Sequence, residues 1–374
     1  MSVDLLLRAF ARTMPAASRD RYLEQWRADA AGAEDAGLRR GDVVRGALAV
    51  VATADRDAPR LTGEPRGAAP RRLSRRGVSV ALAAAVLAAA LWVTGGRDLD
   101  SAVRLDPGFA AGIDAARVAL EALAGCGIAL AAAYVIGAAV VSRRAIARIA
   151  FGSAALGLLM LMVATIWSDA AAVSPLALGL AVGGIAVGLA AAWRSTALAL
   201  VPRSAPVRER WPLAVLGVTA VASLIALGAV DTLVWNPRAK VPGLTIGEIY
   251  DEMIAADGFS PAFAAAHVAA WAAIWLLASL FVAVFALSPA GAWLTPRRLG
   301  ILFLTIVGAA LFFRLFAGFS IGMSLADTFW TSGADESPLS LVFQLVGPSA
   351  VAVAAILFGW APAAREQAEP VPAT

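Results

Sequence analysis

Few side chains that could do chemistry lie within the apolar runs of this sequence. Arg314 is the one charged residue well inside such a run, and three polar residues lie near the ends of other runs: Asp231, His267 and Gln344. A charge in hydrocarbon costs at least about 2.5–3.5 kcal/mol, so Arg314 needs a partner or a role. At one shared depth, the four side chains could form an outward-facing polar pocket for an anion or a small solute. Alternatively, Arg314 could reach the lipid headgroups or form a structural ion pair with Asp231.

Most other chemistries lack the residues they need. His267 is the only histidine and Cys126 the only cysteine, which excludes a metal site built from these residues and an intramolecular disulfide. The sequence contains no Walker A loop, Gly-x-Ser-x-Gly elbow or His-Glu-x-x-His helix. We therefore expect no metal, no cofactor and no catalytic residue.

The elements that must position Arg314 are predicted to be membrane-spanning helices. The chain has 374 residues, 60% of them hydrophobic, and its mean hydropathy is +0.75. This is more apolar surface than a water-soluble core could hide. A helix needs about 18–25 apolar residues to cross a hydrocarbon layer about 30 Å thick. Eight segments meet this requirement: 77–94, 118–141, 149–167, 174–193, 212–233, 263–287, 299–320 and 339–360. The sequence thus predicts an all-α fold, a polytopic membrane helix bundle.

Glycines in the fourth predicted span indicate how that span packs. They recur at short spacing within apolar sequence, at Gly179, Gly183, Gly184 and Gly188. Small residues four apart let helix backbones approach closely in a membrane. We therefore expect a packing face here and no phosphate-binding loop.

The placement of arginine predicts how the bundle is threaded. Arginines crowd residues 1–76 and recur in the breaks after the second, fourth and sixth spans, whereas the other breaks hold most of the acidic residues that lie between spans. The positive-inside rule then places both termini in the cytoplasm. Lys240 is the only lysine, and a bias toward arginine and alanine is typical of GC-rich bacteria, so we expect a bacterial cell (inner) membrane. Because the basic residues belong to loops, the expected partner is the lipid bilayer, without direct binding of nucleic acid.

Residues 1–54 are predicted to form a small cytosolic domain of three helices. Apolar residues recur at helical spacing in three stretches, the second of which could be capped by Ser18. Tyr22 and Trp26 share one face of that stretch and are the candidate partner-binding surface. Residues 55–76, rich in Arg, Pro and Gly, are predicted to be a linker, and residues 361–374 a disordered tail.

The largest break on the predicted outer side is predicted to contain an amphipathic helix over residues 245–256. Thr245 and Glu248 have the spacing of a capping box, in which each side chain accepts the other residue's backbone N–H. Apolar residues then follow on one helical face. The helix is expected to act as a structural lid over the bundle, with a substrate gate as the alternative.

The stretch from Leu5 to Arg56, with MPAASRDRYLEQWRADA at its centre, resembles the short helical prefix domains of actinobacterial membrane proteins. Such a prefix precedes permease spans, or accompanies PadR-type transcription regulators as a helical signalling domain. The resemblance is confined to this N-terminal stretch and assigns no functional residue. It implies a cytosolic protein partner, either a transcription regulator or an ATPase.

Three classes of function remain open at this point. The favoured one is a non-enzymatic membrane regulator or scaffold that acts through its cytosolic helical domain. The alternative is a transporter, or an ABC-type permease subunit that works with a separate ATPase. An intramembrane enzyme is the least favoured, because no paired carboxylates or nucleophile–base pair occur. The oligomeric state is left open.

Overall fold

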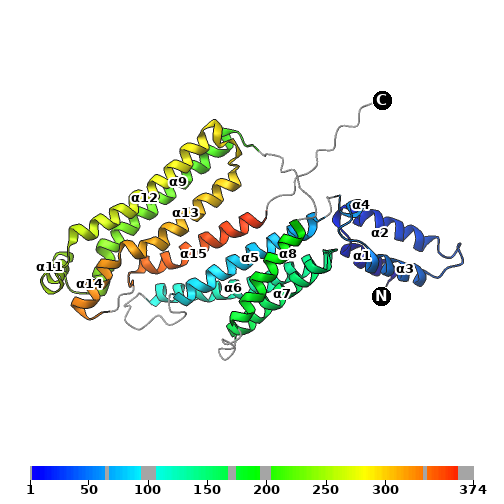
Figure 1. Ribbon diagram of the computed structural model, residues 1–374, viewed down its shortest axis with the longest axis horizontal. Helices are drawn as coiled ribbons and strands as arrows, with labels where there is room; N and C mark the ends of the chain where they lie inside the picture. The colour runs from blue at the N-terminus through cyan, green and yellow to red at the C-terminus, as the bar shows by residue number, and fades with distance from the viewer. Residues whose placement is uncertain are drawn as a thin grey trace. The chain divides into compact units, whose positions relative to one another are not determined.

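A computed structural model describes residues 2–63, 67–93, 107–166, 174–193, 204–331 and 335–360. Within these ranges the chain forms helices and turns without a β-strand (Figure 1). It divides into two compact units, one made of residues 1–78 and 129–199 and the other of residues 79–128 and 200–374. The division cuts through two long helices, α5 (Ala68–Val93) and α6 (Pro107–Val141).

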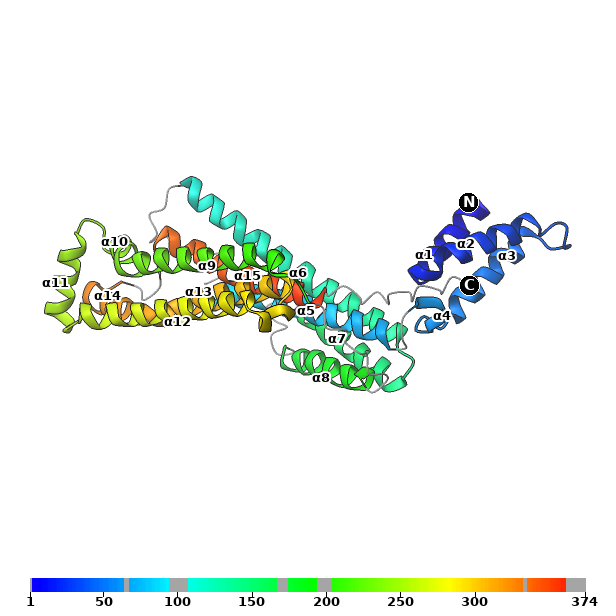
Figure 2. The ribbon, with the colours of Figure 1, turned by 90° about the horizontal axis from the view of Figure 1, so that it is seen from above.

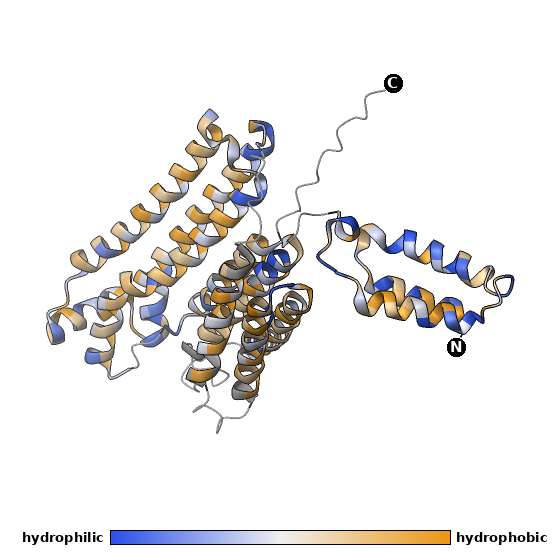
Figure 3. Ribbon diagram, turned by 45° about the vertical axis from the view of Figure 1, so that its right-hand side comes forward, coloured by the Kyte–Doolittle hydropathy of each residue, from blue (hydrophilic) through white to orange (hydrophobic). Residues whose placement is uncertain are grey.

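The N-terminal domain contains the three expected helices and a fourth, short one: α1 (Val3–Thr13), α2 (Ala16–Ala31), α3 (Arg40–Thr53) and α4 (Pro59–Thr62). The helices bury one apolar face each in a shared core that includes Leu7, Met14, Trp26 and Leu61. Hydrophilic residues are interspersed with hydrophobic ones along these helices, as the hydropathy colouring of Figure 3 shows. This amphipathic pattern is what allows such short helices to form stably, because packing supplies most of their stability.

The prediction that Ser18 caps α2 is wrong, because the helix begins three residues earlier. The helix begins after Pro15, whose backbone stands at the cap position, while Ser18 is buried and donates its hydroxyl to the carbonyl of Pro15 over 3.1 Å. Proline presets the backbone angle needed at a helix start and so takes the place of a side-chain cap. An ion pair joins α1 to α2: Arg27 donates to Asp4 over 2.8 Å, and this bond, with a second from Arg8, lowers the pKa of Asp4.

Much of the predicted linker, residues 55–76, is helical. The segment includes α4, and α5 already begins at Ala68. Leu61 is buried in the N-terminal core, which anchors α4, and the buried carboxylate of Asp57 accepts the backbone N–H of Gly67 over 2.8 and 2.9 Å. Composition pointed to a linker because the apolar content is low, and it does not reveal the burial of Leu61 or the hydrogen bonds to Asp57.

The long apolar helices confirm the predicted membrane bundle. Seven helices in the described residues are long and apolar enough to cross a membrane, and α8 contributes a shorter apolar stretch, Gly179–Ala190. Besides α5 and α6, the helices that overlap the predicted spans are α7 (Ala145–Ile166), α8 (Ser174–Trp193), α9 (Val207–Val230), α12 (Pro261–Leu287), α13 (Pro296–Ala317) and α15 (Pro338–Gly359). Large apolar side chains on them face outward, among them Ile149 at 72% and Phe281 at 71% exposure. Such surfaces suit lipid as the solvent.

Small residues allow close helix contacts in both units. A Cβ added to Gly184 of α8 would lie 2.4 Å from the carbonyl oxygen of Ala150 in α7, and one on Gly188 would meet the ring of Phe151 at the same distance. Gly179 and Gly183 have open space instead. The predicted packing face therefore exists, and two of its four glycines make the contact with α7.

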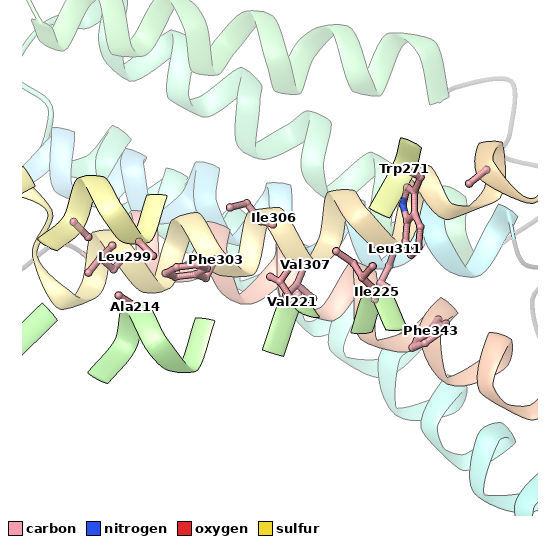
Figure 4. Packing of buried hydrophobic residues seen from close by; sticks show 14 of the residues in the cluster. Ala214, Val221, Ile225, Trp271, Leu299, Phe303, Ile306, Val307, Leu311 and Phe343 are labelled. Carbon is pink, nitrogen blue, oxygen red and sulfur yellow. The ribbon is translucent and has the colours of Figure 1, made fainter. Parts of the chain in front are cut away.

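In the second unit, α9, α12, α13 and α15 pack around a continuous apolar core (Figure 4). Phe303 of α13 lies against Gly217 of α9, where an added Cβ would be 2.3 Å from the ring. The indole Nε1 of Trp271 in α12 donates to the carbonyl of Ala310 in α13 over 2.9 Å. These contacts hold α13, and with it Arg314, in one position.

Short helices close the ends of this bundle. After α9 come a π-helix, η2 (Asp231–Trp235), and α10 (Asn236–Lys240), followed by α11 (Ile246–Asp257); a 3-10 turn, η3 (Pro289–Trp293), precedes α13, and α14 (Phe319–Phe329) follows it. Figure 2 shows α10, α11 and α14 at the same end of the α9–α12 pair. The expected capping box of α11 is present between Thr245 and Glu248, and hydrogen bonds from Thr245 lower the pKa of Glu248.

The seventh predicted span, 299–320, ends earlier than expected. The helix stops at Ala317, and the backbone turns at Gly318 into α14, whose Ile321 and Leu325 pack against Ile249 and Met253 of α11. Because Phe319 is apolar, hydropathy alone predicted a span that continues beyond the helix break at Gly318. As a result of this break, Arg314 lies in the last turn of α13, close to the start of α14.

Candidate functional site

Arg314 and Asp231 form a buried ion pair near the end of the bundle. Arg314 is 5% exposed and Asp231, the first residue of the π-helix, is fully buried. The guanidinium Nη1 donates to Asp231 Oδ2 over 2.9 Å, and Nη2 donates to the carboxylate of Asp335, which precedes α15. One arginine therefore joins α13 to the segments that follow α9 and precede α15.

Hydroxyl groups complete the coordination of this pair. Nη1 of Arg314 also donates to Thr232 Oγ1 over 3.2 Å, and Nη2 to Ser340 Oγ over 3.1 Å. Ser337 and Ser340 each donate a hydroxyl to Asp231. Asp231 thus accepts three hydrogen bonds, which offset the cost of burying a carboxylate in a folded protein.

Asn236 fixes the segment that carries Asp335. Its amide Nδ2 donates to Asp335 Oδ1 over 3.1 Å, and its Oδ1 accepts the backbone N–H groups of Glu336 at 2.8 Å and Ser337 at 3.3 Å. The side chain of Lys240, with no exposed surface, lies 4.0 Å from Glu336. Ser337 also caps α15 by accepting the N–H of Ser340 over 3.0 Å.

We call these residues the Arg314 network: Asp231, Thr232, Asn236, Lys240, Arg314, Asp335, Glu336, Ser337 and Ser340. Its charged members are two cations and three carboxylates. By formal charge, this set has one more carboxylate than cation. Among the described residues no group of histidine, cysteine, aspartate and glutamate could hold a metal ion.

A cavity of about 140 Å³ adjoins the network. Its polar lining comes from Thr232, Asn236, Arg314 and Asp335, and α14 supplies much of the remainder. The Nε of Arg314 is buried and has no hydrogen-bond partner within the described part of the chain. A cavity of this size and polarity can hold several water molecules or one small polar solute.

The structure brings together two of the four residues singled out from the sequence, Arg314 and Asp231. His267 is exposed on α12, and its Nδ1 lies 2.9 Å from the carbonyl oxygen of Phe263 one turn earlier. Gln344 is half-buried on α15 and makes none of the hydrogen bonds of the Arg314 network. Neither His267 nor Gln344 takes part in the Arg314 network.

Sequence reasoning missed Asn236, Asp335, Ser337 and Ser340. Asn236 begins the short helix α10 and Asp335 precedes α15, and both lie between apolar runs, where polar residues carry no special signal. Of these four missed residues, only Ser337 carried a sequence signal, because a serine directly before a proline is a typical helix start. Ser340 follows at the third helical position.

The candidate surface on the N-terminal domain looks different in the structure. Trp26 is only 4% exposed and belongs to the domain's core, with its ring centroid 5.4 Å from that of Tyr22. Apolar side chains that do reach the surface include Leu38 at 51% and Leu48 at 50% exposure, and Arg45 close to Leu48 in sequence is 82% exposed. Trp26 therefore supports the fold from inside the domain, and the exposed apolar side chains of the domain lie elsewhere.

Comparison of the chain with protein-family models, curated proteins and solved structures gave no match.

Proposed function

We propose that this protein is a non-enzymatic membrane regulator or scaffold that presents its N-terminal helical domain to a protein partner. The observation that carries the proposal is the separate core of α1–α4, which includes Leu7, Met14, Trp26 and Leu61. A domain with its own core, joined to α5 by the few residues after Thr62, is suited to holding a partner at the membrane. The fitting partner is a cytosolic transcription regulator or ATPase.

The proposed location is a bacterial cell membrane with both termini in the cytoplasm. The arginine distribution supports this threading, since arginines crowd the N-terminal region and the loops on the same predicted side. The two termini share a side only if α8 also crosses, which its length of 20 residues permits.

The Arg314 network supports the regulator over a carrier. A carrier needs polar groups that exchange partners during transport, whereas Arg314 and Asp231 are already bound to several groups each. Such a network is better suited to holding α9, α13 and α15 in one arrangement. In the proposed role, the bundle is a stable platform for the cytosolic domain.

The test is affinity purification of the full chain from its host, with quantification of the protein that copurifies. Deleting residues 2–54 should remove the partner, and Leu48→Asp should weaken its recovery by at least about tenfold, the effect of losing an interface anchor. The matched control is Ile254→Asp on α11, whose side chain is 45% exposed. Recovery that is unchanged by the deletion would contradict the proposal.

The second candidate, a transporter or permease subunit, draws support from the cavity beside Arg314. Asp335 lines the cavity and is the more exposed of the two carboxylates bound to Arg314, with 20% of its side chain accessible. If the protein moves a small polar solute, Asp335→Asn should abolish uptake in proteoliposomes while partner recovery is unaffected. If the protein is a regulator, partner recovery should also be unaffected by Asp335→Asn, but neither the wild type nor the variant should take up solute.

A further inference from the structure

We propose that an arginine-rich end formed by α5, α6 and α7 binds the headgroups of anionic phospholipids. We define the arginine end by seven residues: Arg71, Arg72, Arg75, Arg76, Arg143, Arg144 and Arg148. The first four lie in the opening turns of α5, and the others lie in and just after the turn that joins α6 to α7. The inference concerns a ligand of α5, α6 and α7 and goes beyond the proposed role of the N-terminal domain.

The packing of α5 against α6 brings these arginines to one level. A Cβ on Gly77 of α5 would lie 3.3 Å from the carbonyl oxygen of Ala131 in α6, and one on Gly137 of α6 would lie 3.6 Å from Leu73 of α5. The two helices are therefore antiparallel, with the start of α5 beside the end of α6. Because only three residues separate the end of α6 at Val141 from the start of α7 at Ala145, the first turn of α7 lies at that level too.

The charge at this end is strongly positive. Residues 67–93 and 129–166 contain no aspartate or glutamate. Residues 55–66 just before them add three carboxylates, Asp55, Asp57 and Glu64, which the arginines of the same stretch match in number. The opposite end of α6 differs, because there Asp114 and Glu121 accompany Arg117. The excess of positive charge is thus confined to one end of the helices.

The depth and chemistry of the arginines suit lipid phosphates. Arg75 and Arg76 directly precede the uncharged apolar run from Gly77 to Val93, so they lie where that run would meet the headgroups. Their side chains are half-buried, while Arg143 and Arg144 are exposed. A guanidinium can bind a phosphate with two parallel hydrogen bonds, and its stem can lie along apolar surface while its head reaches the interface.

The experiment measures which lipids remain bound to the protein. The full chain is reconstituted in nanodiscs of equal parts phosphatidylcholine and phosphatidylglycerol, then extracted, and its retained lipids are quantified by mass spectrometry. We expect enrichment of phosphatidylglycerol in the wild type. In a variant with Arg72, Arg76, Arg143 and Arg144 changed to Gln, the enrichment should fall at least about tenfold, since each basic residue near an anionic surface contributes about fivefold to binding.

Matched variants separate the site from total charge and from folding. Changing Arg12, Arg21, Arg40 and Arg45 of the N-terminal domain to Gln removes the same charge from exposed positions and should leave the enrichment intact. If the first variant aggregates, raised salt must still reduce the enrichment in wild type, because surface electrostatics are screened. Enrichment that survives the glutamine variant, or that ignores salt, would overturn the proposal.

A final arm distinguishes lipid from a soluble anion. In nanodiscs of phosphatidylcholine alone, inorganic phosphate should leave the apparent melting temperature unchanged, whereas phosphatidylglycerol should raise it. Equal stabilisation by inorganic phosphate would mean that the arginine end is a site for a soluble anion and would also overturn the lipid assignment.

Discussion

Arg314 donates a hydrogen bond to Asp231 over 2.9 Å although the two residues are 83 positions apart in the chain. The pair therefore fixes the end of α13 against the first residue after α9. Asp335, Ser337 and Ser340 extend the same contact to the start of α15. Three of the four helices of this bundle thus meet at one buried arginine.

The Arg314 network should contribute strongly to stability. We expect Arg314→Met to lower the free energy of unfolding by about 3–5 kcal/mol, because it leaves buried carboxylates without a cation. Asp335→Asn should cost less, since that side chain is 20% exposed and Arg314 keeps Asp231. The measurement is the apparent melting temperature in detergent, followed by tryptophan fluorescence. Arg208→Met, at an exposed position at the start of α9, is the control and should have almost no effect.

The contact between α13 and α15 should depend on glycine at position 308. A Cβ there would lie 2.2 Å from Cγ2 of Val351 and 3.0 Å from the carbonyl oxygen of Gly347. Gly308→Ala should therefore destabilise the protein by about 1–3 kcal/mol through overpacking. Gly300→Ala in the same helix meets nothing within 4 Å and should be neutral or stabilise by up to about 1 kcal/mol. Equal melting temperatures for the two variants would rule out this packing.

The N-terminal domain should lose its fold when its core is truncated. Leu7 is 1% exposed, whereas Leu5 on the same helix is 55% exposed. We expect Leu7→Ala to cost about 2–5 kcal/mol and Leu5→Ala to cost little. Limited proteolysis of the full chain can follow this, because cleavage within residues 2–62 should become much faster in Leu7→Ala alone. Similar cleavage of the two variants would contradict the assigned core.

Tyr250 should make the stability of the contact between α11 and the π-helix η2 depend on alkaline pH. Burial raises the pKa of Tyr250 to about 12, and its hydroxyl donates to the carbonyl of Leu233 in the π-helix over 2.6 Å. A raised pKa in the folded state means that this contribution is complete below the ordinary tyrosine pKa of about 10 and is lost as the pH rises toward 12. The pKa of Tyr250 can be measured from the difference in tyrosinate absorbance between wild type and Tyr250→Phe as the pH is raised. A tyrosinate signal that arises near pH 10 would show that the residue is not buried.

Hydropathy was sufficient to predict the membrane bundle, and local chemistry was sufficient at some helix starts. The capping box of Thr245 and Glu248 was predictable because both partners lie within four residues. The Arg314–Asp231 pair was foreseeable as one alternative, since a charge in an apolar run requires a partner. The break at Gly318 and the role of Asp335 were not, because they depend on how α14 and the start of α15 pack.

The N-terminal domain illustrates the same limit. Helical spacing predicted its helices, but it could not distinguish a partner-binding face from the domain's own core, and Trp26 belongs to the core. The helical parts of residues 55–76 were missed because composition does not show the burial of Leu61 or the hydrogen bond that Gly67 donates to Asp57.

The most direct test of the account asks on which sides of the membrane the N-terminal domain and α11 lie. Single cysteines are introduced as Arg45→Cys and Glu252→Cys in a Cys126→Ala background, and intact cells are treated with a membrane-impermeant maleimide. Five helices, α5 to α9, separate the two exposed positions, so crossing by all of them places the positions on opposite sides. We predict that position 252 is labelled in intact cells and that position 45 is labelled only after permeabilisation. Labelling of position 45 from outside, or protection of both positions, would contradict the cytosolic placement of the N-terminal domain or the crossing by α8.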